Sequence, residues 1–284
     1  MKILIVGGTS SLAQALNPVL SQFSEVVTAG RAGCDLTLDL ASPAENIQIP
    51  SGIDVVINAA ASFPGTAAED LRHAQEVNVS GLLKLCEACT KSGVGHLVHI
   101  SSIFARLDQG SPMFGAYSLT KRHAEDAAEL YSRQFGLPLT ILQPSQFYSI
   151  GNSQRKHQAL LYTMIDRAEK NEDIFIYGKH DALRNFIHIN DIAQIIARVV
   201  QTGTLGKFAC TSTSNSTLSE LAAAAIKAFG STSRVKFLED KPDVADIAFA
   251  VDDDLYQRID YRPKISILEG MRKEAEHRRS IQPA

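Results

Sequence analysis

The sequence predicts an α/β fold, a doubly wound parallel sheet with a smaller, interleaved lobe toward the C-terminus. Short β-branched apolar runs alternate with helical patterns along the first half of the chain. These runs lack the polar alternation of a half-exposed strand, which indicates strands buried on both faces. The composition agrees, because 45% of the 284 residues are hydrophobic, only 7% are aromatic and none is Trp.

Five apolar runs are predicted to be strands of this sheet, joined by right-handed crossovers. In chain order they are Ile3–Val6, Glu25–Thr28, Asp54–Asn58, His96–Ser101 and Leu139–Gln143. The helical patterns between them span Ser11–Gln22, Ala67–Lys91 and Gly115–Phe135. Residues 1–145 are therefore predicted to form the first domain.

The pattern changes after Pro144. A polar loop at Gly151–His157 precedes a predicted helix at Gln158–Lys170 and a short apolar run at Ile174–Tyr177. Residues 146–284 are predicted to form mainly a second lobe. The strand-then-helix pattern of Asn185–Val200 indicates that a stretch of about 184–210 rejoins the first domain. We expect the polar residues at the end of the chain to fray.

Charge and cysteine usage exclude several classes of protein. Lys and Arg number 28 against 31 Asp and Glu, a formal charge of −3, so nothing predicts a nucleic-acid or anionic-lipid partner. Four cysteines do not make a disulfide scaffold in a chain of this length. The run Ile3–Val6 is too short for a signal peptide, and no stretch reaches the roughly 18–20 apolar residues of a membrane span. We therefore expect a cytoplasmic protein without a membrane partner.

The first predicted strand leads directly into the turn Gly7–Ala13 and then a helix. Turn amides and a helix N-terminus together offer donors and a positive dipole end to a pyrophosphate, so a Rossmann-type dinucleotide site is predicted. The glycine pattern is incomplete, because Ser10 and Ala13 occupy the second and third positions of G-x-x-G-x-x-G. The competing interpretation is a plain helix cap at Ser10.

Arg31 follows the second predicted strand, where an acidic residue would bind the ribose 2′-hydroxyl of NAD. An arginine suits a 2′-phosphate instead, so Arg31 favours NADP over NAD. NAD remains an alternative, because Asp35 or Asp39 could bind the ribose hydroxyl instead. The competing interpretation of Arg31 is a surface residue without a ligand. Asp39 and Leu40 are expected at the edge of the adenine.

Tyr117 and Lys121 are four residues apart, hence on one face of the predicted helix after Gly115. A neighbouring ammonium favours a phenolate, so the pair is suited to proton exchange near neutral pH. Ser101-Ser102 end the preceding strand, at the carboxyl edge where open α/β sheets bind ligands. The Ser102 hydroxyl is predicted to hold a substrate carbonyl or alkoxide against Tyr117.

Zinc-like spacing occurs at Cys86, Cys89, His96 and His99, which read C-x2-C-x6-H-x2-H. We interpret these four residues as core, because the histidines flank a buried strand and the cysteines lie along the preceding helix. His188 alternates with apolar neighbours and is interpreted as structural. No metal site is expected.

Several segments carry a family resemblance: Gly7–Ala13, Val55–Ala61, Asn78-Val79, Ser101-Ser102, Tyr117 with Lys121, Arg184–Ala193, Arg262-Pro263 and Leu268–Gly270. In this order they resemble the extended short-chain dehydrogenase/reductases, also called the NAD-dependent epimerase/dehydratase family. The resemblance implies a nicotinamide cofactor, a nucleotide-diphosphate sugar as substrate and a homodimer. The dimer would form through the helices predicted at Ala67–Lys91 and Gly115–Phe135.

The resemblance also implies roles for individual residues. Ser102 would orient the carbonyl, Tyr117 would exchange the proton, and Lys121 would tune its pKa and bind the ribose. Cofactor contacts are expected from Gly7, Thr9, Ser10, Ser11, Leu12, Arg31, Asp39, Leu40, Asn58, Ala59, Ala60, Asn78, Tyr117, Lys121 and Pro144. Substrate contacts are expected from Ser102, Gln146 and Arg184, the last at a substrate phosphate.

Departures from the family pattern narrow the chemistry. Ile103 and Phe104 follow Ser102 where dehydratases carry an acidic pair, so a dehydratase is not expected. The segment between Ser102 and Tyr117 is shorter than in most sugar-nucleotide epimerases. Gln143 and Gln146 stand where many members have Arg and Asn. Without Trp, stacking on a substrate base is expected from Phe147, Tyr148 or Phe175.

The leading hypothesis is an NAD(P)-dependent oxidoreductase of a nucleotide sugar, either a keto-sugar reductase or a 4-epimerase. Arg31 favours the reductase, because an exchangeable NADPH suits net reduction. One alternative is an NADPH-dependent reductase of a small non-nucleotide carbonyl compound. Another is a non-catalytic NADP-binding sensor, which would not need Ser102, Tyr117 and Lys121 together.

Overall fold

The computed structural model describes residues 1–151, 153–250 and 252–281. In these residues seven strands form the central sheet, in the order β11-β6-β5-β4-β1-β2-β3, with every pairing parallel. The strands are β1 Lys2–Val6, β2 Glu25–Gly30, β3 Leu36–Thr37, β4 Val55–Asn58, β5 His96–Ile100, β6 Leu139–Pro144 and β11 Gly206–Cys210. The sheet is the predicted doubly wound, Rossmann-like one, and all five predicted strands are in it.

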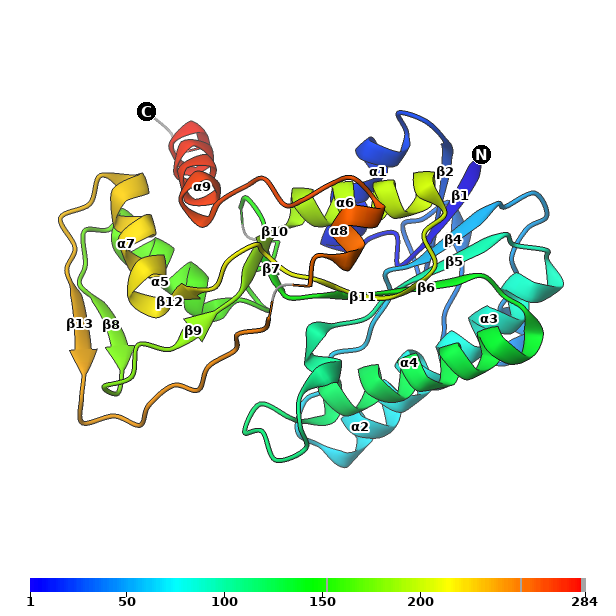
Figure 1. Cartoon of the computed structure of the whole chain (residues 1–284), viewed down its shortest axis with the longest axis horizontal. Coiled ribbons are helices and arrows are strands. Elements are labelled where there is room, and N and C mark those ends of the chain that lie inside the picture. Colours follow the sequence, from blue (N-terminus) through cyan, green and yellow to red (C-terminus); the bar gives the residue numbers. More distant parts are fainter. Residues whose placement is uncertain (152, 251, 282–284) are drawn as a thin grey trace. The chain divides into compact units, whose positions relative to one another are not determined.

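Helices cover both faces of this sheet (Figure 1). One face carries α2 Ala68–Gln75, α3 Gly81–Lys91 and α4 Ala116–Phe135, and the other carries α1 Ser11–Leu20 and α6 Ile189–Thr202. The single helix predicted over Ala67–Lys91 is divided, because a π-helical turn at Glu76–Ser80 separates α2 from α3. π-helical turns inside helices are frequent at functional sites.

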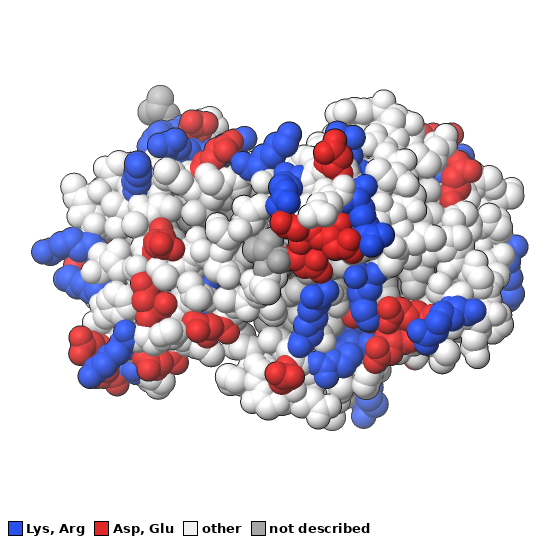
Figure 2. Space-filling view, in the orientation of Figure 1, with Lys and Arg blue, Asp and Glu red and all other residues white. Residues whose placement is uncertain are grey.

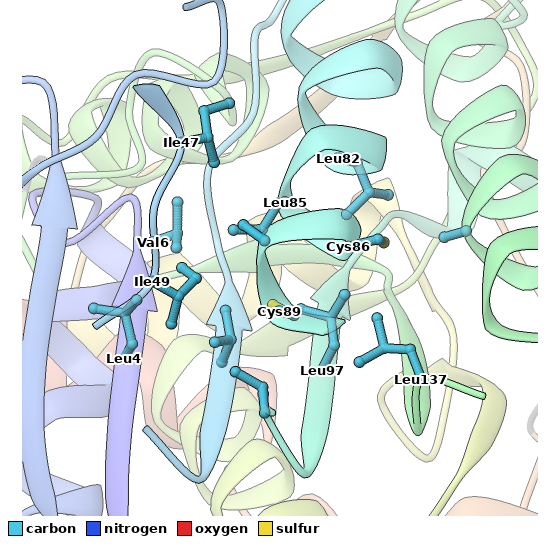
Figure 3. Packing of buried hydrophobic residues seen from close by; sticks show 14 of the residues in the cluster. Leu4, Val6, Ile47, Ile49, Leu82, Leu85, Cys86, Cys89, Leu97 and Leu137 are labelled. Atoms are coloured by element: carbon cyan, nitrogen blue, oxygen red, sulfur yellow. The ribbon is translucent and has the colours of Figure 1, made fainter. Parts of the chain in front are cut away.

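The core between the sheet and α3 explains why these segments form strands and a helix (Figure 3). Leu4 and Val6 of β1, Leu82 and Leu85 of α3, and Leu97 of β5 belong to one cluster, each at most 1% exposed. Burying a side chain of this size contributes about 1.5–3 kcal/mol. The side of β5 that faces this core becomes polar toward the carboxyl end of the strand. Ser101 follows Leu97 by four residues, so its side chain is expected on the same face. The carboxyl edge of the sheet is therefore the polar end.

Contacts divide the chain into two units. The first comprises Met1–Pro144, Ala193–Cys210 and Asp253–Tyr261, which includes the short helix α8 Asp254–Arg258. The second, so far as it is described, comprises Ser145–Ile192, Thr211–Asp252 and the chain from Arg262. The sequence did not predict that Asp253–Tyr261 would belong to the first unit.

The second unit combines short strand pairs with three helices among its described residues. The strands are β7 Gln146–Tyr148 beside β10 Phe186–His188, β8 Ile174–Tyr177 beside β13 Val235–Leu238, and β9 Leu183–Arg184 beside β12 Ser216–Thr217. The helices are α5 Ala159–Glu169, α7 Leu218–Phe229 and α9 Ile267–Ile281. Tyr162, Leu221 and Met271, one from each helix, are at most 1% exposed and form the core of this unit.

The expectation of a fraying C-terminal tail is wrong for residues 267–281, which form α9. Gly270, Met271, Glu274 and Ala275 of this helix are buried. The polar composition misled the prediction, because Arg278 and Glu274 pair with each other at 2.7 Å instead of facing solvent.

Figure 2 shows Lys and Arg side chains interspersed with Asp and Glu on the visible face. Among the described residues, the helices are all too short or too polar to cross a membrane.

Candidate functional site

The turn after β1 brings Gly7 against the loop that follows β4. Gly7 has a φ of +86°, and a Cβ there would lie 2.7 Å from the Ala60 nitrogen, so glycine is required. The Gly7 N–H donates to the Ala29 carbonyl at 2.8 Å, which anchors the turn to β2. Ser10 then caps α1, its Oγ accepting the Ala13 N–H at 3.2 Å. The cap and a phosphate site are compatible, because both use the N-terminus of one helix.

The surroundings of this turn fit a dinucleotide pyrophosphate. The turn lies where β1 separates β2 from β4, which is the point at which strand order reverses and such folds bind ligands. Gly8 approaches β2 so closely that a Cβ would lie 2.6 Å from the Thr28 Cβ. Thr9 is exposed, Ser11 is half-buried at the first position of α1, and Leu12 is buried below it.

Asn58 fixes the chain at the carboxyl end of β4. Its side chain accepts the Ala60 N–H at 3.2 Å, and its amide nitrogen lies 3.3 Å from His99 Nδ1 on β5. Ala59 and Ala60 are half-buried and form the backbone that Gly7 approaches. The Asn58 side chain thus holds this backbone in place, and its contacts with a cofactor stay predictions.

Asn78 lies in the π-helical turn, and its side chain is used within the protein. It accepts the Ser62 N–H at 2.7 Å and donates to the Ser62 carbonyl at 2.9 Å and to Thr120 Oγ1 at 3.1 Å. The structure therefore places Asn78 as a link from the loop after β4 to α4. A direct cofactor contact by Asn78 stays a prediction.

The residues expected near the adenosine follow β2. Arg31 is exposed, whereas the Asp39 carboxylate accepts the Ala41 N–H at 3.1 Å. The Asp35 carboxylate accepts the N–H and the hydroxyl of Thr28 at 2.8 and 2.7 Å, and these hydrogen bonds lower the pKa of Asp35. Both carboxylates thus accept hydrogen bonds from nearby residues, whereas Arg31 and Asp35 are both exposed to solvent.

Leu40 and Pro144 are both buried and lie at opposite sides of the predicted cofactor site. Leu40 packs so closely on α3 that a Cβ at Gly81 would lie 2.7 Å from the Leu40 Cβ. Pro144 is the last residue of β6, at the carboxyl edge of the sheet. Their cofactor contacts stay predictions.

Ser102, Tyr117 and Lys121 are brought together at this edge. Ser102 follows β5 and caps a short 3-10 helix, with its Oγ accepting the Phe104 N–H at 3.2 Å. The Ser102 side chain interacts with Tyr117 and favours the charged form of its phenol, which lowers the pKa of Tyr117 in part. Lys121 is one turn further along α4, with its Nζ 5.9 Å from the centre of the Tyr117 ring and 2.9 Å from the Ile100 carbonyl oxygen that it donates to.

Burial dominates the proton affinities of this pair. It raises the pKa of Tyr117 to about 12, and the interaction with Ser102 offsets only part of that rise. It lowers the pKa of Lys121 to about 8, against the attraction of Glu125. Burial penalises the charged forms of both groups, and the role of Lys121 in favouring the phenolate of Tyr117 stays a prediction. Both groups are held toward their neutral states.

A recess of about 670 Å³ opens beside Tyr117 in the first unit. Its lining includes Leu71 in the first turn of α2, and Phe104 and Met113 in the segment between β5 and α4. None of its described lining residues is charged. Phe63 stacks on the Tyr117 ring with centroids 4.8 Å apart and an interplanar angle of 12°. The recess suits an uncharged, partly apolar portion of a ligand.

Behind Lys121 lies a buried carboxylate that sequence reasoning missed. Glu125 of α4 is 4% exposed and accepts from Ser101 Oγ and from Gln143 Nε2, the latter at 2.9 and 2.8 Å to its two oxygens. The Gln143 Oε1 accepts from Arg106 Nε at 2.6 Å. The available signal was spacing, because Glu125 continues the four-residue interval from Tyr117 to Lys121.

Lys207 of β11 is the cation at the outer side of this carboxylate, with its Nζ 3.8 Å from Glu125 Oε2. Burial raises the pKa of Glu125, and the hydrogen bonds of Ser101 and Gln143 together with Lys207 and Lys121 lower it only in part. The recess and this carboxylate depend on how separate segments meet, which explains why motif spacing alone did not reveal them.

The two remaining predicted substrate residues belong to the second unit. Gln146 on β7 donates through Nε2 to Gln158 at 3.0 Å, and its buried Oε1 has no hydrogen-bond partner among the described residues. Arg184 is 4% exposed, and its Nη1 donates to the carbonyls of Leu183 and Ala245 at 2.8 and 2.7 Å. Both side chains are held in place, and their substrate contacts stay predictions.

The three candidates for base stacking differ in exposure. Tyr148 is 3% exposed and packs edge-on against Phe186 and His188, so its selection as a stacking residue is wrong. Phe147 is half-buried on β7. Phe175 is 37% exposed on β8, with the Arg167 guanidinium 5.1 Å from its ring centre.

The zinc-like spacing does not produce a metal site. Cys86 and Cys89 lie in the core of the first unit, and burial raises the pKa of the Cys86 thiol to about 12. His96 Nε2 lies 2.8 Å from Thr140 Oγ1, and burial lowers its pKa to about 4. In the described parts of the chain, no three His, Cys, Asp or Glu side chains gather as a metal ion would require.

Comparison with known proteins gives a consistent family assignment. The family model described as "NAD dependent epimerase/dehydratase family" matches residues 3–208. The dTDP-4-dehydro-6-deoxy-D-allose reductase of Streptomyces sp. is 25% identical over 210 residues, which is 67% of this chain and 64% of that protein. The chain thus spans slightly less than two thirds of that relative.

Two solved structures show the same fold over essentially the whole chain. The UDP-glucuronic acid 4-epimerase of Bacillus cereus, in complex with UDP-glucuronic acid and NAD, has a TM-score of 0.80 at 18% identity, covering 99% of this chain and 100% of that one. RMD from Pseudomonas aeruginosa, complexed with NADPH, has a TM-score of 0.78 at 16% identity, covering 98% and 99%.

Proposed function

Because the chain belongs to the NAD-dependent epimerase/dehydratase family, we propose that it is a nicotinamide-dependent enzyme of nucleotide-diphosphate sugars. The reaction is the reduction of a keto-sugar or a 4-epimerisation. The observation that carries the proposal is the placement of Tyr117 beside an uncharged recess, with the Lys121 ammonium 5.9 Å from its ring centre, at the sheet edge that also carries the Gly7 turn. The names of a similar reductase and of similar epimerases support this substrate class.

The residues of the chain divide the work as follows. The chemistry supplied by a bound nicotinamide is hydride transfer at the sugar carbon. Ser102 orients the sugar oxygen through its Oγ, and Tyr117 gives or takes the proton at that oxygen. Lys121 stabilises the negative charge that develops on the phenol when Tyr117 gives up its proton.

The recess of the first unit is proposed to bind the sugar, and Arg184 is proposed, as a separate assignment, to bind a phosphate of the substrate. The described lining of the recess carries no charge that could bind a phosphate or a sugar carboxylate. Arg184 has a guanidinium already fixed by two carbonyls, which makes it a preorganised cation. The unpartnered Oε1 of Gln146 is proposed to accept a substrate hydroxyl.

The same recess favours a second candidate, reduction of a small uncharged carbonyl compound. An uncharged lining with Leu71, Phe104 and Met113 suits an aldehyde or ketone as well as a sugar ring. Arg184→Ala separates the two candidates. If the substrate is a nucleotide sugar, its KM should rise by about tenfold or more, because one charge-assisted contact is lost. The KM of a small carbonyl compound should stay unchanged.

Tyr117→Phe tests the enzyme proposal most directly. The phenyl ring keeps the stacking on Phe63 but removes the hydroxyl, so turnover of a nucleotide sugar should fall by about 10²–10⁴-fold. Affinity for the cofactor, followed by fluorescence of NADPH or NADH, should change little. Tyr131→Phe on the same helix is the control, because Tyr131 packs beside Phe135, and wild-type turnover in Tyr117→Phe would refute the assignment.

Arg31→Ala tests the choice of cofactor. We propose NADP, because Arg31 is exposed after β2 while Asp35 and Asp39 accept hydrogen bonds within the loop. The dissociation constant of NADPH should rise by about tenfold, the loss of one charge-assisted contact, and that of NADH should stay within about twofold. Equal changes for both cofactors would favour NAD and, with it, an epimerase.

A further inference from the structure

We propose that Glu125 is a positioning residue for Lys121, and that its carboxylate maintains the positive charge of the ammonium behind Tyr117. The proposal rests on the proposed function for the catalytic task of Lys121. The coupling between the two charges is a property of the folded chain and can be measured without turnover.

The geometry places both groups on one structural support. Tyr117, Lys121 and Glu125 are spaced by four residues and share one face of α4. Lys121 donates to the carbonyl of Ile100 at 2.9 Å, and Glu125 accepts from the hydroxyl of Ser101, the next residue of the chain. A movement of the end of β5 therefore acts on the ammonium and the carboxylate together.

Among the charged groups around Lys121, the carboxylate of Glu125 is the one that opposes the effect of burial on the pKa of Lys121. Burial lowers the pKa of Lys121, and Glu125 raises it. His99 of β5 also interacts with Lys121, but burial keeps the pKa of His99 well below its usual value, so this imidazole is neutral. Tyr117 is likewise held neutral, because burial raises its pKa to about 12.

Glu125 itself is held mainly by neutral donors. Ser101 and Gln143 supply its hydrogen bonds, and Arg106 binds Gln143 in place of the carboxylate. Lys207 is 3.8 Å away and is itself paired with a second carboxylate at 2.7 Å. The carboxylate of Glu125 therefore interacts with two cations, the half-exposed Lys207 of β11 and the buried Lys121 of its own helix. Lys121 is the one of the two that lies beside Tyr117.

The direct test is a titration of Lys121 in the cofactor-free protein. Lysine labelled with ¹³C at Cε is followed by NMR, and Lys121→Met assigns the signal. In Glu125→Gln the midpoint of Lys121 should fall by about one pH unit or more, because the carboxylate that raises the pKa of Lys121 has been removed. Asp126→Asn removes the same charge from an exposed position of α4 and should shift the midpoint far less. Equal shifts in the two variants, or none, overturn the proposal.

A reciprocal measurement keeps the test decisive if Glu125→Gln does not fold. Coupling between two sites is equal in both directions, so Lys121→Met must raise the titration midpoint of Glu125 by the amount that Lys121 loses. The ¹³Cδ signal of Glu125 reports this midpoint. An unchanged midpoint in Lys121→Met overturns the proposal.

The pH profile of kcat/KM connects the coupling to turnover. The alkaline limb, where Lys121 loses its charge, should move to lower pH in Glu125→Gln by the shift seen in the titration, and Glu125→Asp should restore part of it. If the two charges are coupled and the wild type turns over no nucleotide sugar, the proposed function fails and the coupling stands. If turnover is normal and the limb does not move, the positioning role fails alone.

Discussion

Each unit holds a cluster of charged side chains, buried in the first unit and partly exposed in the second, and the two clusters are built in opposite ways. In the second unit, Arg278 of α9 contacts three carboxylates: Asp166 at 2.9 Å, Glu169 at 2.6 Å and Glu274 at 2.7 Å. Arg155 adds a second cation 2.6 Å from Asp166. Cations and carboxylates therefore meet in direct contact.

In the first unit, Glu125 is surrounded by neutral hydrogen-bond donors, and burial raises its pKa. Lys121 is buried one turn away with a pKa lowered to about 8. Matched charges satisfy one another and hold helices in place, whereas poorly matched buried charges are ready to change protonation. The difference indicates that the first cluster serves chemistry and the second serves the fold.

Arg278→Met should break the matched cluster and have the largest effect. It leaves Asp166, Glu169 and Glu274 without their shared cation, which should lower the free energy of opening of α9 by about 3–5 kcal/mol. Hydrogen exchange of the α9 amides measures this loss. Arg279→Met, at an exposed neighbouring position, should cost less than about 0.5 kcal/mol. A comparable loss in both variants would mean that the cluster does not hold the helix.

Acid should act on the two clusters with opposite signs. Burial raises the pKa of Asp166, but its hydrogen bonds to Arg155 and Arg278 outweigh burial and leave that pKa lowered. A carboxyl with a lowered folded pKa stabilises the fold above its unfolded pKa near 3.9, and this contribution is lost as the pH falls through that range. Protection of α9 amides should therefore decrease between about pH 5 and pH 3.

Glu125 should show the reverse trend. Its folded pKa is raised, so its ionised form destabilises the first unit, and protonation relieves that penalty as the pH falls through the folded pKa. Protection of α4 amides, corrected for intrinsic exchange, should be kept or increased over the interval in which α9 loses protection. Parallel losses in α4 and α9 would contradict the contrast between the clusters.

Much of the fold could be predicted because its signals are local. Uninterrupted β-branched runs such as Ile3–Val6 identified the buried strands, and all five predicted strands are in the sheet. The last helix was missed because its polar composition resembles a solvated tail. What makes α9 a packed helix is the pairing of Arg278 with carboxylates on a distant segment, which no local pattern contains.

The candidate site divides in the same way. The four-residue spacing predicted that Tyr117 and Lys121 share one face of a helix, and the Lys121 Nζ lies 5.9 Å from the centre of the Tyr117 ring. The roles of Ser102, Tyr117 and Lys121 stay predictions. The burial that raises the pKa of Tyr117 could not be predicted, because residue spacing identifies a neighbouring charge and not how deeply a side chain is enclosed. Glu125 and the recess required knowledge of which segments meet at the carboxyl edge.

Lys207→Met should have the smallest effect on stability and still distinguish the two clusters. Lys207 is 33% exposed, so losing its pairs should cost at most about 1 kcal/mol in the free energy of unfolding measured with urea. The same change should raise the pKa of Glu125 further, since Lys207 is one of the cations that lower it. Glu129→Gln is the matched control, because it breaks the 2.7 Å pair between Lys207 and Glu129 and leaves Lys207 beside Glu125.

A rise of the Glu125 titration midpoint in Lys207→Met alone would show that the carboxylate responds to charge and not to packing at the sheet edge. The same rise in both variants would remove that distinction, and with it the argument that the first cluster is electrostatically poised.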